Sequence, residues 1–159
     1  MPSPLGSSVS RAKSSEEQSE TKLTHPFEVM QREVTQAEWT QFGWPNPSGL
    51  DDAGRGDCVA ANCAVGNVTW DEALAYANRL SKAKGLAECY ALSACTGEPG
   101  SHMLCEKLSS SFSSIYECPG YRIPTEAEWE YFARAGTKSA YFSGNVQLPA
   151  EIYDPQPAL

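Results

Sequence analysis

Six cysteines constrain this chain more than any other feature of its 159 residues. All six lie between residues 58 and 118, and they are Cys58, Cys63, Cys89, Cys95, Cys105 and Cys118. An even number of cysteines around loops in a small chain is typical of a disulfide framework in an oxidising compartment. We therefore expect an extracytoplasmic location (periplasmic, surface or secreted), although the first ten residues lack the basic and apolar regions of a signal peptide.

The spacing of the cysteines favours one pairing as a hypothesis. Cys58 and Cys63 are close enough in sequence to form a local clip, and a Cys95–Cys105 bridge can nest inside Cys89–Cys118. Two alternatives stay open. One is a zinc site that combines His102 with three of the cysteines, although the spacing matches no familiar zinc ribbon or finger. The other is a set of free thiols.

Composition limits the domain organisation and the partners. The chain is long enough for one domain, with 41% hydrophobic residues for a core. A net charge of −8 and the lack of a basic patch argue against binding nucleic acid. No apolar run is long enough to span a bilayer. Residues 1–24 are rich in Ser, Glu and Lys and are predicted to be a disordered leader, followed by a folded region at 25–159 with a cysteine-rich insert at 86–118.

Three Thr-x-x-Glu capping boxes predict three helices, which begin after Thr35, Thr69 and Thr125. In the second helix an apolar stripe at i, i+3, i+4 and i+7 predicts a core face of Ala73, Tyr76, Ala77 and Leu80. Strands are expected at 26–34, with Phe27 and Val29 pointing inward, at 88–92, and at 140–145. The serine run at 109–114 is expected to be a surface loop.

The third capping box lies in the run 120–136, where every local signal predicts a strand that turns directly into a helix. Pro124 ends the extended segment, and Pro124 and Trp129 have the spacing of a hydrophobic staple. Trp129 and Phe132 share a face that is expected to be buried. Gly136 suits the C′ position of the helix.

Three separated segments resemble one family in their order and character. They are Glu33-Val-Thr-Gln-Ala-Glu-Trp39, Val68-Thr-Trp-Asp-Glu-Ala-Leu-Ala-Tyr-Ala-Asn78 and Gly120-Tyr-Arg-Ile-Pro-Thr-Glu-Ala-Glu-Trp-Glu-Tyr131. The family is that of the formylglycine-generating enzymes, or sulfatase-modifying factors. Its hallmark Arg-Leu-Pro-Thr-Glu-Ala-Glu-Trp-Glu-Tyr is matched with only Ile123 in place of Leu. The matching hallmark residues, interpreted as structural, are Arg122, Pro124, Thr125, Glu126, Glu128, Trp129, Glu130 and Tyr131.

The resemblance implies an irregular, loop-rich α+β fold related to C-type lectins. It also implies oxidation of a sulfatase cysteine to Cα-formylglycine, with molecular oxygen and a copper ion held by two cysteines, and calcium ions that support the fold. The family's copper pair and most calcium ligands lie beyond the hallmark run. The chain is therefore interpreted as the N-terminal part of such a domain, inactive alone, with no catalytic, cofactor-binding or metal residue of its own.

The implied partner is a sulfatase-type protein client. The alternative is a non-catalytic, lectin-like module that binds an unknown protein or carbohydrate ligand.

Other candidate residues have simpler structural interpretations. Glu126 and Glu130 are expected on a solvated face, and Glu128 in a helix cap. Asp71 and Glu72 are first-turn acids of a helix. The acids at positions 51, 52 and 57 lack the order of a calcium-binding EF-hand loop. Asn67-Val-Thr69 fits an N-glycosylation acceptor, but Thr69 is already explained as an N-cap.

Overall fold

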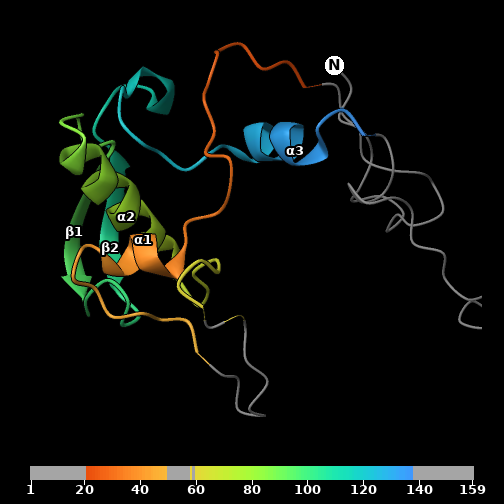
Figure 1. Cartoon of the computed structure of the whole chain (residues 1–159). Helices are drawn as coiled ribbons and strands as arrows, with labels where there is room; N and C mark the ends of the chain where they lie inside the picture. The colour runs from red at the N-terminus through yellow and green to blue at the C-terminus, as the bar shows by residue number, and fades with distance from the viewer. Residues whose placement is uncertain (1–20, 50–57, 59, 138–159) are drawn as a thin grey trace, which may run out of the picture. The chain divides into compact units, whose positions relative to one another are not determined.

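The computed structural model of the chain describes residues 21–49, 58 and 60–137. The chain divides into two compact units, one comprising Phe27–Ile123 and the other comprising Pro124–Leu159 with Met1–Pro26. The described elements form a small α+β arrangement, as predicted (Figure 1). In chain order they are α1 (Gln36–Thr40), α2 (Trp70–Ala83), β1 (Tyr90–Thr96), β2 (Leu104–Ser110), the 3-10 helix η2 (Ile115–Glu117) and α3 (Glu126–Arg134). Nearly all of the expected leader and the expected strand at 140–145 lie outside the described residues.

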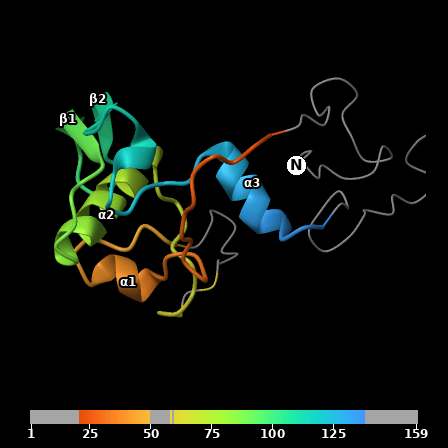
Figure 2. The same ribbon diagram turned by 90° about the horizontal axis from the view of Figure 1, so that it is seen from above.

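Helix α2 is the centre of the Phe27–Ile123 unit. Both views place it between the β1–β2 hairpin and α1 (Figures 1 and 2). The helix begins at the predicted capping box, in which the Thr69 hydroxyl accepts from the Glu72 N–H and the Glu72 carboxylate accepts from the Thr69 N–H. Leu74, Tyr76 and Ala77 are buried. The helix ends before Gly85, whose φ of +70° suits the chain reversal that follows.

An aromatic cluster joins α1 to α2. Trp39 is 1% exposed, and its ring stacks on that of Tyr76 with centroids 5.5 Å apart and planes 8° apart. Phe42 and Trp44 contact the same rings edge-on or at a tilt. The indole N–H of Trp39 donates to the Pro45 carbonyl at 2.8 Å, so this buried polar atom is satisfied. Burial of each large aromatic stabilises the fold by roughly 2–3 kcal/mol, which makes this cluster the main apolar core of the unit.

Strands β1 and β2 pair antiparallel, with Leu92 opposite Leu108 and Cys95 opposite Cys105. Helix α2 holds the outer edge of β1 through one side chain. The Asn78 amide donates to the Tyr90 carbonyl at 2.7 Å and accepts from the Tyr90 N–H at 3.0 Å. A two-stranded hairpin is marginal by itself, so this amide acts in place of a third strand at that position.

Glu72 fixes the segment between the strands to the start of α2. Its carboxylate is fully buried and accepts hydrogen bonds from the N–H groups of Thr69, Gly100 and Met103 at 2.8, 2.9 and 3.0 Å. The neighbouring Asp71 carboxylate accepts from the Cys105 N–H at 2.7 Å. These two first-turn acids are structural, as the sequence indicates, but their main partners belong to the cysteine-rich insert.

Gly100 brings the insert against a third segment. Its φ is +89°, and a Cβ atom built there would collide with the carbonyl group of Pro45. That carbonyl is the one to which Trp39 donates. The aromatic cluster and the Glu72 contacts therefore meet at a position where only glycine fits.

Three of the expected local structures are wrong, in whole or in part. Residues 120–124, expected to be a strand that turns into a helix, form no strand. Residues 26–34 form no strand, and Val29 is 50% exposed rather than inward-facing. No described strand pairs with this segment beyond the isolated bridge between Thr35 and Ala64, so its β-propensity has no ladder to join. The serine run is a loop only in part, because its first two residues end β2.

We predict that Glu72→Gln lowers the free energy of unfolding by about 2 kcal/mol, because hydrogen bonds to a buried charge contribute roughly 1.5–3 kcal/mol each. Urea unfolding followed by circular dichroism measures the effect. The matched control is Glu88→Gln at an exposed position, which should change stability by less than about 0.5 kcal/mol. Equal stability of the two variants would contradict the role given to Glu72.

Gly100→Ala and Gly85→Ala separate steric collision from backbone strain. Both glycines have positive φ, but a Cβ at Gly85 meets nothing within 4 Å. We expect Gly85→Ala to cost about 1–2 kcal/mol from the left-handed backbone alone. Gly100→Ala should cost at least about 2 kcal/mol more, since the Pro45 carbonyl must also move. The melting temperatures of the two variants measure the difference in stability. Similar losses of stability in both would show that the loop at Pro45 moves at little energetic cost.

Candidate functional site

All six cysteines lie in the described residues and all are paired. The structure contains three disulfides, Cys58–Cys63, Cys89–Cys118 and Cys95–Cys105, and no free thiol. The prediction of a disulfide framework is therefore confirmed, and the nested arrangement is the one hypothesised from spacing. Cys89 is fully buried, whereas Cys58 and Cys95 are exposed. Three disulfides indicate a protein of an oxidising environment.

The Cys58–Cys63 loop closes over the start of α1. The N–H groups of Gln36 and Ala37 donate to the carbonyls of Cys63 and Ala61 at 2.8 and 2.9 Å. The Gln36 side chain donates to the Cys58 carbonyl at 2.7 Å. The first N–H groups of a helix lack partners within the helix, so this disulfide loop supplies the acceptors they need.

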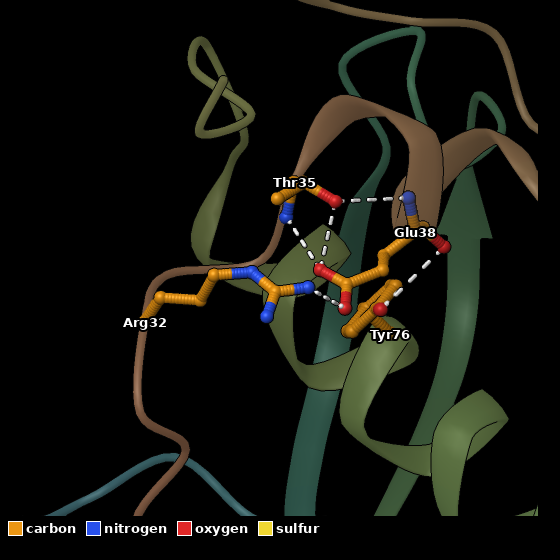
Figure 3. A network of polar contacts seen from close by, with 4 residues as sticks. All are labelled: Arg32, Thr35, Glu38 and Tyr76. Atoms are coloured by element: carbon orange, nitrogen blue, oxygen red, sulfur yellow. Dashed lines mark hydrogen bonds and ion pairs between the residues drawn. The ribbon is translucent and has the colours of Figure 1, made fainter. Parts of the chain in front are cut away.

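Glu38 is the polar centre of the α1 region (Figure 3). Its carboxylate accepts from the N–H and hydroxyl of Thr35 at 2.9 and 2.8 Å and pairs with the Arg32 guanidinium at 2.7 Å. The hydrogen bonds from Thr35 lower the pKa of Glu38, and Arg32 adds to this effect. The Tyr76 hydroxyl donates to the Glu38 backbone carbonyl. Burial, helped by the Glu38 charge, raises the pKa of Tyr76 to about 12, so this phenol stays protonated.

Burial and hydrogen bonding act on Glu72 in opposite directions. Burial raises the pKa of its carboxyl, but the N–H groups of Thr69, Met103 and Gly100 outweigh burial, and the net pKa is lowered. The group is therefore a charged structural anchor at neutral pH. Its pKa is lowered, whereas a general acid that acts at neutral pH needs a raised pKa.

The family hallmark crosses the boundary between the two units, so its parts are described separately. In the Phe27–Ile123 unit, the Arg122 guanidinium lies 5.4 Å from the centroid of the Tyr116 ring. The Ile123 N–H donates to the Tyr90 hydroxyl at 2.9 Å. Gly120 packs against the Ala87 carbonyl and the Ser81 hydroxyl, where a Cβ would collide with both. These contacts are those of a packed scaffold.

In the other unit, α3 begins at the predicted capping box of Thr125 and Glu128, and Glu128 is 2% exposed. Two expectations for this helix are wrong. Trp129 is 58% exposed and Phe132 is only half-buried, so the face that they share is not a buried core face. Glu130 is not solvated, because its side chain is 23% exposed and pairs with Arg134 at 3.8 Å. Glu126 is exposed as expected, and Pro124 is half-buried.

The end of α3 is as predicted. The C-cap residue is Ala135, so Gly136 takes the C′ position, with a φ of +83°. Ala135 is also left-handed, with a φ of +46°.

The described residues do not fit the metals that the family resemblance implies. Within this part of the chain, no group of three or more His, Cys, Asp or Glu side chains could hold a metal ion. Copper binds to cysteine as a thiolate, and all six sulfurs are already joined to each other. The zinc alternative fails for the same reason. The three acids considered for calcium, at 51, 52 and 57, lie outside the described residues.

A shallow hollow lies beside α1, lined by Gln36, Ala37, Thr40, Gln41, Asn46 and Ala61. Its polar atoms are occupied by one another. The Asn46 amide donates to the Gln36 amide oxygen at 2.9 Å, and the Thr40 hydroxyl donates to the Gln36 carbonyl at 2.9 Å. A sugar or other polar ligand would find few free hydrogen-bonding groups here.

The main surface that the sequence analysis missed is apolar and lies at the junction of α2 with β2. We call it the β2 strip, and its residues are Trp70, Leu104, Glu106 and Leu108. Trp70 is 60% exposed, and the two leucines are 59% and 41% exposed. By helical spacing Trp70 shares the face of Leu74 and Ala77, which predicts burial. It is exposed although the next two residues of α2, Asp71 and Glu72, are buried against the insert, so Trp70 lies on the side of this turn that the insert leaves uncovered.

The sequence matches the sulfatase-modifying factor enzyme 1-like domain over residues 4–156. The chain therefore belongs to this family, and its small α+β arrangement is consistent with that domain. It is also 34% identical over 79 residues to the "Chaperone protein LppX" of Paenibacillus barcinonensis. That alignment covers 50% of this chain and 28% of the relative, so the chain spans less than a third of that protein. No solved structure matches the chain significantly.

No described helix combines the length and the apolar character needed to cross a bilayer.

The carboxylates of Glu72 and Glu38 predict how stability depends on pH. The pKa values of Glu72 and Glu38 are lowered from 4.5 in the folded protein. Their contribution is therefore complete above about pH 4.5 and is lost as the pH falls through the lower folded values. Urea midpoints should be nearly constant from neutral pH to about pH 5 and fall at lower pH.

The Glu72→Gln variant is the control for that pH series. Its deficit relative to the unmutated protein should shrink as the pH falls, because protonation removes the same charge from Glu72. A deficit that stays constant down to about pH 2 would contradict this assignment.

Proposed function

We propose that this chain is a non-catalytic, protein-binding scaffold of the sulfatase-modifying factor family. The observation that carries the proposal is the state of its cysteines. The oxidase chemistry of the family needs a pair of thiols to hold copper, whereas here six of six sulfurs stabilise loops. Without copper held by the chain, oxidation of a client cysteine by molecular oxygen has no centre in these residues.

A protein client fits the surface better than a carbohydrate does. The hollow at Gln36 and Asn46 has its polar groups engaged internally, which disfavours a lectin-type sugar site. Large apolar side chains are instead exposed on the Phe27–Ile123 unit, as is typical of surfaces that contact other proteins. The relative from Paenibacillus barcinonensis carries the name of a chaperone protein, which supports the same class of function.

The disulfides support a place of action outside the cytoplasm, where a client is newly exported and still unfolded. A small scaffold stapled by disulfides keeps its own fold in that setting while it binds apolar segments of a client. The client class that the family suggests is a sulfatase-type protein. We propose binding of unfolded or partly folded segments, without conversion of a cysteine.

The test of binding is suppression of aggregation. The oxidised chain should reduce the light scattering of heat-denatured citrate synthase in a dose-dependent way, reaching at least half suppression at roughly equimolar ratio, because exposed apolar side chains shield those of the client. Ribonuclease A, another small disulfide-bonded protein, is the inert comparison. Scattering equal to that with ribonuclease A would reject the binding function.

The test of the non-catalytic assignment is chemical. A peptide with a sulfatase-type cysteine motif should remain unmodified after incubation with the chain, copper(I) and oxygen. Mass spectrometry detects the aldehyde product directly. Appearance of the aldehyde would show oxidase activity and overturn this part of the proposal.

A further inference from the structure

The β2 strip has a regular arrangement of apolar and acidic side chains. In an extended strand alternate side chains point to the same face, so Leu104, Glu106 and Leu108 share one face of β2. The leucines are about 13 Å apart along the strand, with the carboxylate between them. On the paired strand, Leu92 lies opposite Leu108 and Thr96 lies opposite Leu104. The face is therefore apolar at both ends and acidic in the middle.

Trp70 lies near the Leu104 end of this face. The Thr69 hydroxyl donates to the Met103 carbonyl at 2.8 Å, and the Asp71 carboxylate accepts from the Cys105 N–H at 2.7 Å. The residues on either side of Trp70 are thus bonded to the residues on either side of Leu104. The side chains of Trp70 and Leu104 are each about three-fifths exposed. They lie at the same junction without being needed for the core.

The strip is held rigidly although its side chains contribute little to folding. The Cys95–Cys105 disulfide joins the two strands one pair from the loop end of the hairpin, and the Glu72 carboxylate holds Met103 just before β2. A surface that is already ordered loses little conformational entropy when a ligand binds. Rigid exposed aromatic and aliphatic side chains are typical of binding hot spots.

The charge of the strip selects one class of occupant. Glu106 is exposed, and the ion pairs of the described residues, Arg32–Glu38 and Glu130–Arg134, do not involve it. The whole chain carries a net charge of −8. A basic residue between two apolar ones would neutralise Glu106 while its neighbours cover the leucines.

We propose that the β2 strip binds extended client segments in which a basic residue lies between large apolar residues at every second position. The proposal rests on the protein-binding function above and names the class of segment that it takes. The preferred pattern is apolar, any, basic, any, apolar, because side chains two apart in an extended segment face the same way and match the spacing on β2.

Fluorescence anisotropy with two labelled peptides tests this proposal on the oxidised full chain. One peptide repeats Leu-Ser-Lys-Ser-Leu, and the other has Glu in place of Lys. The lysine peptide should bind about tenfold more tightly or better, since like charges across an interface are strongly disfavoured. Equal binding of the two peptides would overturn the assignment of charge.

Matched variants test whether the peptide binds at the β2 strip. Leu104→Ser and Trp70→Ser should each weaken binding of the lysine peptide about tenfold, while Leu86→Ser, at a leucine 41% exposed elsewhere in the same unit, should leave it unchanged. Glu106→Lys should reverse the preference between the peptides, whereas Glu88→Lys, with the same change in net charge, should not. Equal effects of Leu86→Ser and Leu104→Ser would overturn the proposal. Circular dichroism of each exposed-site variant confirms that it is folded.

The aggregation assay separates this proposal from the function on which it rests. If Leu104→Ser and Trp70→Ser suppress aggregation as well as the unmutated chain, the protein-binding function stands and the β2 strip is not its site. If the unmutated chain neither suppresses aggregation nor binds either peptide, both proposals fail together. If Leu104→Ser and Trp70→Ser lose the suppression of aggregation while the other variants keep it, both proposals are supported.

Discussion

The buried carboxylate of Glu72 is the interaction on which the Phe27–Ile123 unit depends. It closes the capping box of α2 and, with the same charge, accepts N–H groups from Gly100 and Met103 in the insert. A buried charge is costly unless it is fully hydrogen-bonded, so the carboxylate dictates where the insert lies. Gly100 then touches the Pro45 carbonyl, which links the insert to the aromatic cluster. One side chain thus connects helix, hairpin and core.

The disulfides act on the loops that this carboxylate does not reach. Cys58–Cys63 shapes a loop whose carbonyls satisfy the start of α1, and Cys89–Cys118 joins the start of the hairpin to the segment after η2. The scaffold is small, and its largest aromatic cluster lies between only two helices. Disulfides are the usual means by which small domains compensate for a limited core. The same bonds occupy all six sulfurs of the chain, so none of them is free as a thiolate.

Membership of the family is shown for this chain, whereas its lack of oxidase activity is our proposal. The hallmark run that identifies the family is scaffold wherever the structure describes it, with Arg122 over the Tyr116 ring and Glu128 in a cap. The chemistry of a domain resides in its site residues rather than in its fold. Our proposal that the chain recognises another polypeptide rests on an exposed apolar strip with an acid at its centre.

Local sequence signals determined the helix starts and the pairing of nearby cysteines. A Thr-x-x-Glu box involves one turn of backbone, so Thr35, Thr69 and Thr125 predict their helices without knowledge of distant residues. Cysteine spacing likewise suggested the nested arrangement of disulfides, because short loops restrict which thiols can meet. The family was visible for the same reason, since its hallmark is a local run.

Only the tertiary structure decided what each helix and strand contacts. The sequence predicts that Glu72 caps a helix. Its hydrogen bonds to Gly100 and Met103, which lie 28 and 31 residues further along the chain, depend on how the insert folds back. Trp70 and Trp129 have the spacing of core residues and are exposed, because burial depends on which segments cover a face rather than on periodicity. The segment around Val29 has the composition of a strand and no partner in the described part of the chain. Propensity is local, whereas pairing and burial are properties of the assembled fold.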